Sequence, residues 1–356
     1  MTTSPKRSAD DYLAEFRADP MNAPLALYAG AALADEGRDQ EALAVWTLGD
    51  DANAALRTVQ YHPEANAEMR ALSARADAAI CEHFNSLHRS IIDELADSLG
   101  DENLDRVRNS IWVHYHRQKV EYRTPRQAPM IFYMPDLPAA PVVARETLPW
   151  VNEIEESYTD ILREYEKVIA DTAHIEPYVP EGMPGGEWRK LSGMLDWAAI
   201  YLYYNTEKTR NTDLFPETLA ALDKAPLLKK NGAPGEIFFS KLKPGAHIPP
   251  HYGLTNTRLT VHLPIRVPEG CSIRVGDDVH YWKEGEIIAF DDSFEHEAWH
   301  RGEGERVVLI FETHHPDLSA AECEAIERVY AGFDAWVAGR HALIGMDAPS
   351  QAIDAP

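Results

Sequence analysis

Two histidines, His251 and His296, are placed where both could bind one metal ion. His251 comes shortly before a segment of alternating apolar residues, and His296 lies 45 residues further on, in FDDSFEHEAWH. A strand–turn–strand pattern separates them, and in a jelly roll such distant strands become neighbours across the barrel. Because imidazole binds iron, zinc, copper and nickel, the two histidines alone leave the identity of the metal open.

The strand that follows His251 carries its polar residues on one face. In RLTVHLPI, the side chains of Arg258, Thr260 and His262 share a face, and the apolar residues between them share the other. Arg306 begins a later strand, RVVLIFET, with the same alternation. An inward arginine is costly in an apolar strand unless it is paired, and a dicarboxylate would pair it through two parallel hydrogen bonds. These residues together predict a site for a metal and an organic acid.

Each of these residues also has a plainer interpretation when it is taken alone. His262 is typical of a buried core histidine, and Arg258 is typical of a strand residue in a salt bridge. The metal-site interpretation therefore depends on the ordered set of residues and not on any single one.

Short strands dominate the second half of the chain. From about Gly235 the pattern has period two in EIFFSKLK, RLTVHLPIRV, CSIRVG, VHYWKEGEIIAF and RVVLIFET, with Gly, Pro or Asp turns between them. Many short strands of this kind predict a sandwich, a barrel or a jelly roll.

The first hundred residues show helical periodicity instead. Leu25 and Leu33 recur at helical spacing, Gly37 interrupts the pattern, and a second apolar face follows up to Trp46. This helix pair resembles one tetratricopeptide repeat, without a clean second copy. Two interpretations stay open: a surface that binds a protein partner, and a plain helical extension that packs on the next domain.

Composition narrows the class of protein. The 356 residues include 58 acidic and 34 basic ones, so the formal net charge of −24 should repel nucleic acid and anionic membranes. The three cysteines form no CxxC pair, which favours a reduced, cytoplasmic protein. No run of about 18 apolar residues occurs, and the first residues do not resemble a signal peptide, so we expect no membrane span.

Three segments together resemble the aspartyl/asparaginyl β-hydroxylase family: PPHYGLTNTRLTVHLPI, GCSIRVGDDVHYWKEGEIIAFDDSFEHEAWH and RVVLIFETHHPDL. The resemblance is dense from Glu236 to Leu318 and extends more thinly to MPDLPAAP, LPWVNEIEESY and LDWAAIYLY. It implies an Fe(II)- and 2-oxoglutarate-dependent dioxygenase. The expected fold is therefore α+β, with a double-stranded β-helix (jelly roll) core preceded by an α-helical region. The expected parts are a tetratricopeptide-like helical region (1–105), the dioxygenase domain with flanking helices (106–335) and a C-terminal tail (336–356).

The resemblance also implies roles for individual residues. His251 and His296 match the family's two iron ligands. Gly253 stands where other oxygenases of this kind have a carboxylate, which implies that water completes the coordination. Arg306 matches the arginine that grips the far carboxylate of 2-oxoglutarate, and Ser240 matches its hydroxyl partner.

Further residues match the walls of the same site. His262 matches a residue at the near end of the cosubstrate, and Trp197 matches an aromatic wall of that pocket. The family's animal enzymes carry a second arginine where this chain has Thr260, and that arginine is associated with gripping an acidic substrate side chain. Arg258 and Thr260 are thus the expected substrate-binding residues, with Arg258 left to do related work.

The expected reaction is hydroxylation of an aspartyl/asparaginyl-type residue in a peptide or protein, with Fe(II), 2-oxoglutarate and O2, forming succinate and CO2. Thr260 keeps a second interpretation open, hydroxylation of a free amino acid or other small molecule. A third interpretation is a non-catalytic helical-repeat adaptor, against which the intact histidines argue. A lipid substrate is disfavoured by the lack of a membrane segment.

Overall fold

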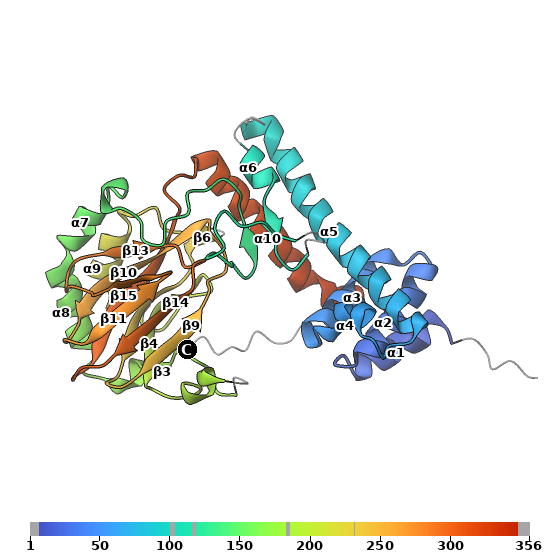
Figure 1. The fold of residues 1–356 in the computed structure, drawn as a ribbon, viewed down its shortest axis with the longest axis horizontal. Helices are drawn as coiled ribbons and strands as arrows, with labels where there is room; N and C mark the ends of the chain where they lie inside the picture. The colour runs from blue at the N-terminus through green and yellow to red at the C-terminus, as the bar shows by residue number, and fades with distance from the viewer. Residues whose placement is uncertain (1–6, 100–103, 116–118, 183–185, 231, 348–356) are drawn as a thin grey trace, which may run out of the picture. The chain divides into compact units, whose positions relative to one another are not determined.

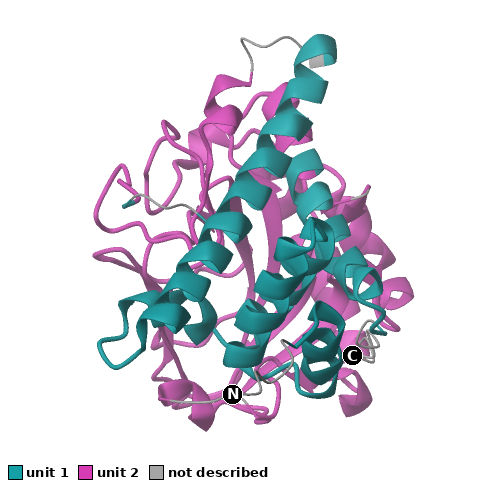
Figure 2. Cartoon of the chain, turned by 90° about the vertical axis from the view of Figure 1, so that its right-hand side faces the viewer, with its two compact units in different colours: residues 1–100, 115–119, 328–352 teal, residues 101–114, 120–327, 353–356 magenta. Residues whose placement is uncertain are grey.

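The computed structural model describes residues 7–99, 104–115, 119–182, 186–230 and 232–347. The chain forms two compact units. Unit 1 comprises residues 1–100, 115–119 and 328–352, and unit 2 comprises 101–114, 120–327 and 353–356 (Figure 2). Each is described by itself below.

Unit 1 is helical, as the periodicity predicts. Its helices are α1 (Ala9–Ala18), α2 (Ala23–Asp35), α3 (Asp39–Ala52), α4 (Ala55–Thr58), the 3-10 turn η1 (Val59–Tyr61), α5 (Ala67–Leu99) and the part of α10 (Ala320–Leu343) from Arg328 onward. Small residues let α2 and α3 approach closely. A Cβ atom on Gly30 of α2 would lie 2.2 Å from Nε1 of Trp46 on α3, so only glycine fits at this crossing.

Unit 2 contains two antiparallel sheets. The larger sheet has the order β13 (Ile288–Phe290), β10 (Arg258–Arg266), β15 (Arg306–His314), β8 (Ile237–Leu242), β4 (Trp197–Tyr204) and β3 (Glu176–Pro177), with β5 (Glu207–Lys208) also paired to β4. The smaller sheet has the order β12 (Asp278–His280), β11 (Cys271–Val275), β14 (His296–His300) and β9 (His247–His251). From β8 to β15 the chain passes back and forth between the two sheets, which is the topology of a double-stranded β-helix. The predicted α+β fold with a jelly-roll core is confirmed.

Shorter elements complete unit 2. They are α6 (Asp105–Arg108), β1 (Ile111–Trp112) paired with β2 (Phe132–Tyr133), η3 (Arg145–Thr147), α7 (Val151–Glu155), α8 (Tyr158–Val168), η4 (Thr172–His174), η5 (Glu187–Lys190), η6 (Thr212–Leu214), α9 (Pro216–Leu222) and β6 (Lys229–Lys230) paired with β7 (Ala233–Pro234). Helices α7, α8 and α9 lie along one side of the sheets in Figure 1.

Alternation along the larger sheet gives it two buried faces. Leu259, Val261 and Leu309 belong to a core shared with α7, α8 and α9, on the outer face. Leu242 and Val308 belong to a second core, shared with residues of the smaller sheet. The inner face thus faces the barrel interior, and it is the face that carries the polar residues of β10 and β15.

Candidate functional site

The two histidines come together on neighbouring strands of the smaller sheet. His251 ends β9, His296 begins β14, and the two residues form a register pair with ring centroids 4.0 Å apart. Each Nδ1 atom is 3.0 Å or less from the carbonyl oxygen two residues earlier: 2.8 Å to Pro249 O and 3.0 Å to Phe294 O. A histidine that donates from Nδ1 to a carbonyl offers Nε2 to a metal, with its ring fixed.

Burial keeps both rings neutral. Burial, and next the neighbouring imidazole, lowers the pKa of His251 to about 3. Burial also lowers the pKa of His296. Neutral imidazole is the form that binds a metal ion, so the pair is ready to do so near pH 7. Within the described ranges, no group of three His, Cys, Asp or Glu side chains is arranged to hold a metal ion, so the protein would contribute these two imidazoles.

A carboxylate occupies the space beside the histidine pair. A Cβ atom on Gly253 would lie 2.1 Å from Cγ of Asp292, so Gly253 leaves the room that this side chain fills. Asp292 is 6% exposed, and its Oδ2 atom accepts from Thr260 Oγ1 at 3.1 Å. Its charge acts on His296, whose pKa it raises against the effect of burial. The sequence analysis did not single out Asp292; its signal was the acidic pair in FDDSFEH.

Arg306 lies fully buried on the inner face, with no acidic partner in the part of the chain that the structure describes. It is 1% exposed, and burial lowers its pKa to about 10. One guanidinium nitrogen donates to Ser240 Oγ at 3.1 Å, and Trp197 Nε1 donates to the same oxygen at 3.0 Å. The guanidinium carbon lies 4.4 Å from the ring centroid of Trp282, and Nε has no hydrogen-bond partner among the described residues. A buried cation of this kind fits an organic anion, as the sequence predicts.

His262 lies between this cation and the histidine pair. It is 5% exposed, and burial, Arg306 and His296 hold its pKa well below the usual range. Its ring packs edge-on against Phe290, at 5.0 Å between centroids. Its Nδ1 atom has no hydrogen-bond partner among the described residues. The structure thus brings the predicted metal and cosubstrate residues, from six different strands, to one interior.

Arg258 is already paired by two acids. Its guanidinium lies 2.7 Å from Glu312 Oε1 and 3.4 Å from Asp292 Oδ2, and its side chain is only 15% exposed. These ion pairs are what the interpretation of Arg258 as a strand residue in a salt bridge expects. Thr260, which stands where a second arginine would be, donates to Asp292 instead of to a ligand.

An aromatic residue that sequence reasoning missed also reaches the histidine pair. The ring of Trp188, on η5, packs edge-on against His251 at 5.4 Å between centroids and lies 6.3 Å from the ring of Trp197. No local pattern marks Trp188, because 63 residues separate it from His251 in the sequence.

Comparison with known proteins gives matches over the part of the chain that contains the site. The family model described as aspartyl/asparaginyl beta-hydroxylase matches residues 155–316. Aspartate beta-hydroxylase domain-containing protein 2 of Xenopus tropicalis is 30% identical over 264 residues, which cover 70% of this chain and 68% of that protein. The chain belongs to the aspartyl/asparaginyl β-hydroxylase family. The family predicted from the sequence is thereby confirmed.

The names of two other similar proteins state different substrates. Aspartyl/asparaginyl beta-hydroxylase of Mus musculus is 33% identical over 187 residues, which cover 51% of this chain and 25% of that protein. Ornithine lipid ester-linked acyl 2-hydroxylase of Rhizobium tropici is 34% identical over 185 residues, which cover 51% of this chain and 63% of that protein. Membership of the aspartyl/asparaginyl β-hydroxylase family therefore supports hydroxylation without fixing the substrate.

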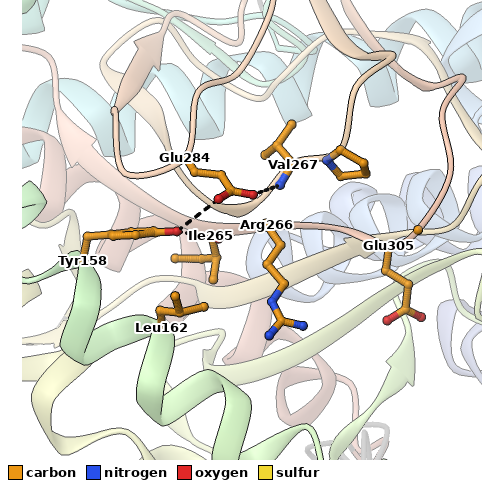
Figure 3. Close-up of a pocket in the computed structure, with 9 residues that line it drawn as sticks. Tyr158, Leu162, Ile265, Arg266, Val267, Glu284 and Glu305 are labelled. Atoms are coloured by element: carbon orange, nitrogen blue, oxygen red, sulfur yellow. Dashed lines mark hydrogen bonds between the residues drawn. The ribbon is translucent and has the colours of Figure 1, made fainter.

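Two further observations concern the surroundings of the site. A surface pocket lies where β10 ends, lined by residues that include Tyr158, Arg266 and Glu284 (Figure 3). Its polar groups satisfy one another, since Tyr158 donates to Ile265 O at 2.9 Å and Val267 N donates to Glu284 at 2.8 Å, so it carries no sign of a ligand. In the part of the chain that the structure describes, no helix has both the length and the apolar character to cross a bilayer.

Replacing Gly253 with alanine should destabilise unit 2. The added Cβ would meet Asp292 at 2.1 Å, and such overpacking of a filled site costs about 1–3 kcal/mol of unfolding free energy. Urea denaturation would measure the loss. Gly339→Ala is the matched control, because nothing lies within 4 Å of a Cβ there and alanine favours a helix. Equal stability of Gly253→Ala and wild type would show that Asp292 moves away freely.

Glu312 should make the protein less stable as pH rises. Burial raises the pKa of Glu312 from 4.5 to about 7, against the effect of Arg258, so between these values the folded state binds the proton that the unfolded state releases. Its contribution to stability is therefore present below about pH 4.5 and is lost as pH rises to about 7, by up to about 3 kcal/mol. In Glu312→Gln this dependence should disappear, as measured by urea denaturation from pH 4.5 to 8. An unchanged pH profile would contradict the assignment.

Proposed function

We propose that the protein is an Fe(II)- and 2-oxoglutarate-dependent hydroxylase that acts on an amino-acid side chain, in a peptide or protein or in a free amino acid. The observation that carries the proposal is the buried, acid-free guanidinium of Arg306, hydrogen-bonded to Ser240 on the same inner face as His262. One dicarboxylate would satisfy this cation, and two neutral imidazoles would hold the metal that the same molecule chelates.

The residues present fit both groups. His251 and His296 offer two fixed imidazoles to Fe(II), and Arg306 with Ser240 offers two donors to the far carboxylate of 2-oxoglutarate. His262 and Trp197 enclose the space between them. Bound iron with O2 would supply the oxidative decarboxylation that forms succinate and CO2 and hydroxylates an unactivated C–H bond. The protein's part is to position the cosubstrate and to keep bulk water away from the interior.

Membership of the family supplies the first candidate for the substrate. An aspartyl/asparaginyl-type residue of a peptide is the family's named substrate, and the helices of unit 1 would then be a surface for a protein partner. A free amino acid or other small molecule is the second candidate. Thr260 favours it, because the second arginine expected for an acidic side chain is absent and Arg258 is already paired.

Two further expectations belong to this proposal. Cys81, Cys271 and Cys323 form no disulfide bond with one another, which suits a reducing compartment, and we place the protein in the cytoplasm. The net charge of −24 gives no support to a nucleic-acid partner or an anionic membrane surface. An adaptor without catalysis would need neither a buried free arginine nor a prepared histidine pair, so we rank it last.

Succinate formation from 2-oxoglutarate tests the proposal. Proton NMR would follow the reaction with Fe(II), ascorbate and air, with and without a pool of peptides and amino acids. Turnover in wild type that rises with the pool, and falls to background in the His251→Ala/His296→Ala variant, is the expected result. Wild type that neither binds nor turns over 2-oxoglutarate would overturn it.

A further inference from the structure

A row of acidic and aromatic side chains lies beyond the cosubstrate residues on the inner face. Thr260 of β10 pairs in register with Glu312 of β15, and His262 pairs with Ile310. Glu312 is therefore two residues, about 7 Å, further along its strand than the level of His262. Arg306 lies six residues away at the other end of the same strand. The level of His262 thus separates the row from Arg306, the residue assigned to the far carboxylate of 2-oxoglutarate.

Glu236 extends this row across the sheet. Phe311 and Tyr203 both pair with Ile237, and one residue further the register places Glu236 between Glu312 and Tyr204. Glu236 is half-buried, and the cation that acts on its charge is Arg258, which also pairs with Glu312 and Asp292. Burial raises the pKa of Glu236, and the charge of Arg258 offsets only part of this desolvation cost.

Aromatic rings surround Glu236 on the side away from Arg258. Its charge raises the pKa of Tyr178, Tyr201 and Tyr204, after the larger effect of burial on each. The rings of Tyr201 and Tyr204 are 4.9 Å apart in an edge-to-face arrangement, and Tyr178 lies 6.5 Å from Tyr201. Tyrosine faces attract organic cations, and a carboxylate beside them adds a charged acceptor.

The charges of the row do not balance. Among the described residues, Arg258 is the cation paired with Glu312 and Asp292, and its charge also acts on Glu236, so three acidic side chains share one guanidinium. The buried Oδ1 atom of Asp292, which lies beside Gly253, also has no hydrogen-bond partner among the described residues. The imbalance does not indicate a second metal, since the described residues hold no cluster of three metal-binding side chains.

We propose that the substrate presents an organic cation, an ammonium or guanidinium group, to the carboxylates of Glu236 and Glu312 and the rings of Tyr201 and Tyr204. The inference rests on the proposed function, because it names the charge of the group that is held beside the metal and 2-oxoglutarate. It also gives Thr260 a role. A small neutral side chain at this position leaves the acidic row accessible, whereas an arginine there would neutralise it.

Matched four-carbon probes test the charge directly. Ligand-observed proton NMR would compare n-butylguanidinium, n-butylammonium, butyramide and butyrate, with the full-length protein loaded with Zn(II) and 2-oxoglutarate. The two cations should bind and butyrate should not. Glu236→Gln and Glu312→Gln should each weaken cation binding by about tenfold or more, as expected for loss of a charge-assisted hydrogen bond. Thr260→Arg should reverse the preference toward butyrate.

Controls separate this inference from the proposed function. Glu146→Gln, an exposed acid on η3, should leave the preference for cations as it is in wild type. Butyrate that binds as tightly as the cations, cations that do not bind, or cation binding that is unaffected in both glutamine variants would overturn the inference. The same spectra report 2-oxoglutarate. Its failure to bind wild type would count against the proposed function, and normal binding of 2-oxoglutarate with a preference for butyrate would count against the substrate charge alone.

Discussion

Arg306→Met should abolish tight binding of 2-oxoglutarate and yet stabilise the ligand-free protein. The guanidinium is the cation that we assign to the far carboxylate, and two charge-assisted hydrogen bonds are worth at least about 3 kcal/mol, or more than a hundredfold in affinity. In the absence of ligand the same group is a fully buried charge without an acidic partner among the described residues. Methionine is a shorter, flexible apolar side chain whose thioether makes favourable contacts with aromatic rings, and the ring of Trp282 lies beside this site.

The gain in stability should be about 1–3 kcal/mol, because a desolvated charge is replaced with an apolar side chain. Ser240 keeps a donor in the variant, since Trp197 Nε1 already bonds to its oxygen, so no new unsatisfied group is created there. Thermal unfolding with and without 2-oxoglutarate would show both effects. Wild type should gain stability with ligand, and Arg306→Met should start higher and gain nothing.

Arg301→Met provides the control for this experiment. Arg301 lies in the turn before β15, is exposed, and contacts the face of Trp299. Its loss should leave the response to 2-oxoglutarate intact. A variant Arg306→Met that still responds to 2-oxoglutarate would remove the cosubstrate role, whereas a loss of ligand response with lowered stability would show that Arg306 mainly supports the fold.

Local pattern was enough to predict the residues that face the barrel interior. A strand has period two, so the alternation of β10 and β15 assigns Arg258, His262 and Arg306 to inner faces without knowledge of the fold. The strand order was predictable only through the resemblance, because alternation does not say which strands pair. With that order, His251 and His296 become neighbours although 45 residues separate them.

Contacts between side chains on different strands could not be predicted from the alternation within one strand. A salt bridge was one of the two interpretations open for Arg258, but its acidic partners could not be named, because Glu312 is 54 residues away and Asp292 lies in a turn. Gly253 indicated a missing carboxylate, but only its closeness to Asp292 shows that another acid fills that volume. The balance of charges depends on which residues are neighbours in three dimensions, and the sequence alone does not give these neighbours.

Replacing both His251 and His296 with alanine should weaken the affinity for the metal ion by about four orders of magnitude. Four-ligand zinc sites are worth about 10–16 kcal/mol, so each imidazole contributes about 3 kcal/mol, and two account for about 6 kcal/mol. Because no third His, Cys, Asp or Glu side chain completes a cluster with them among the described residues, little affinity should remain. Anaerobic calorimetry with Fe(II), and with Zn(II) as a redox-inert substitute, would measure it. Single variants should fall in between.

His247→Ala distinguishes a metal site from a general effect of removing a ring. His247 lies on the same strand as His251, pairs with Glu297 at 2.9 Å and stacks on Trp299. It is also partly exposed, so its loss should leave metal affinity near that of wild type. If His247→Ala and the double variant lost metal to the same extent, the effect would come from a disturbed sheet. If neither lost it, the ion would be bound elsewhere, and the short distance between the two rings would have to be explained as ordinary core packing.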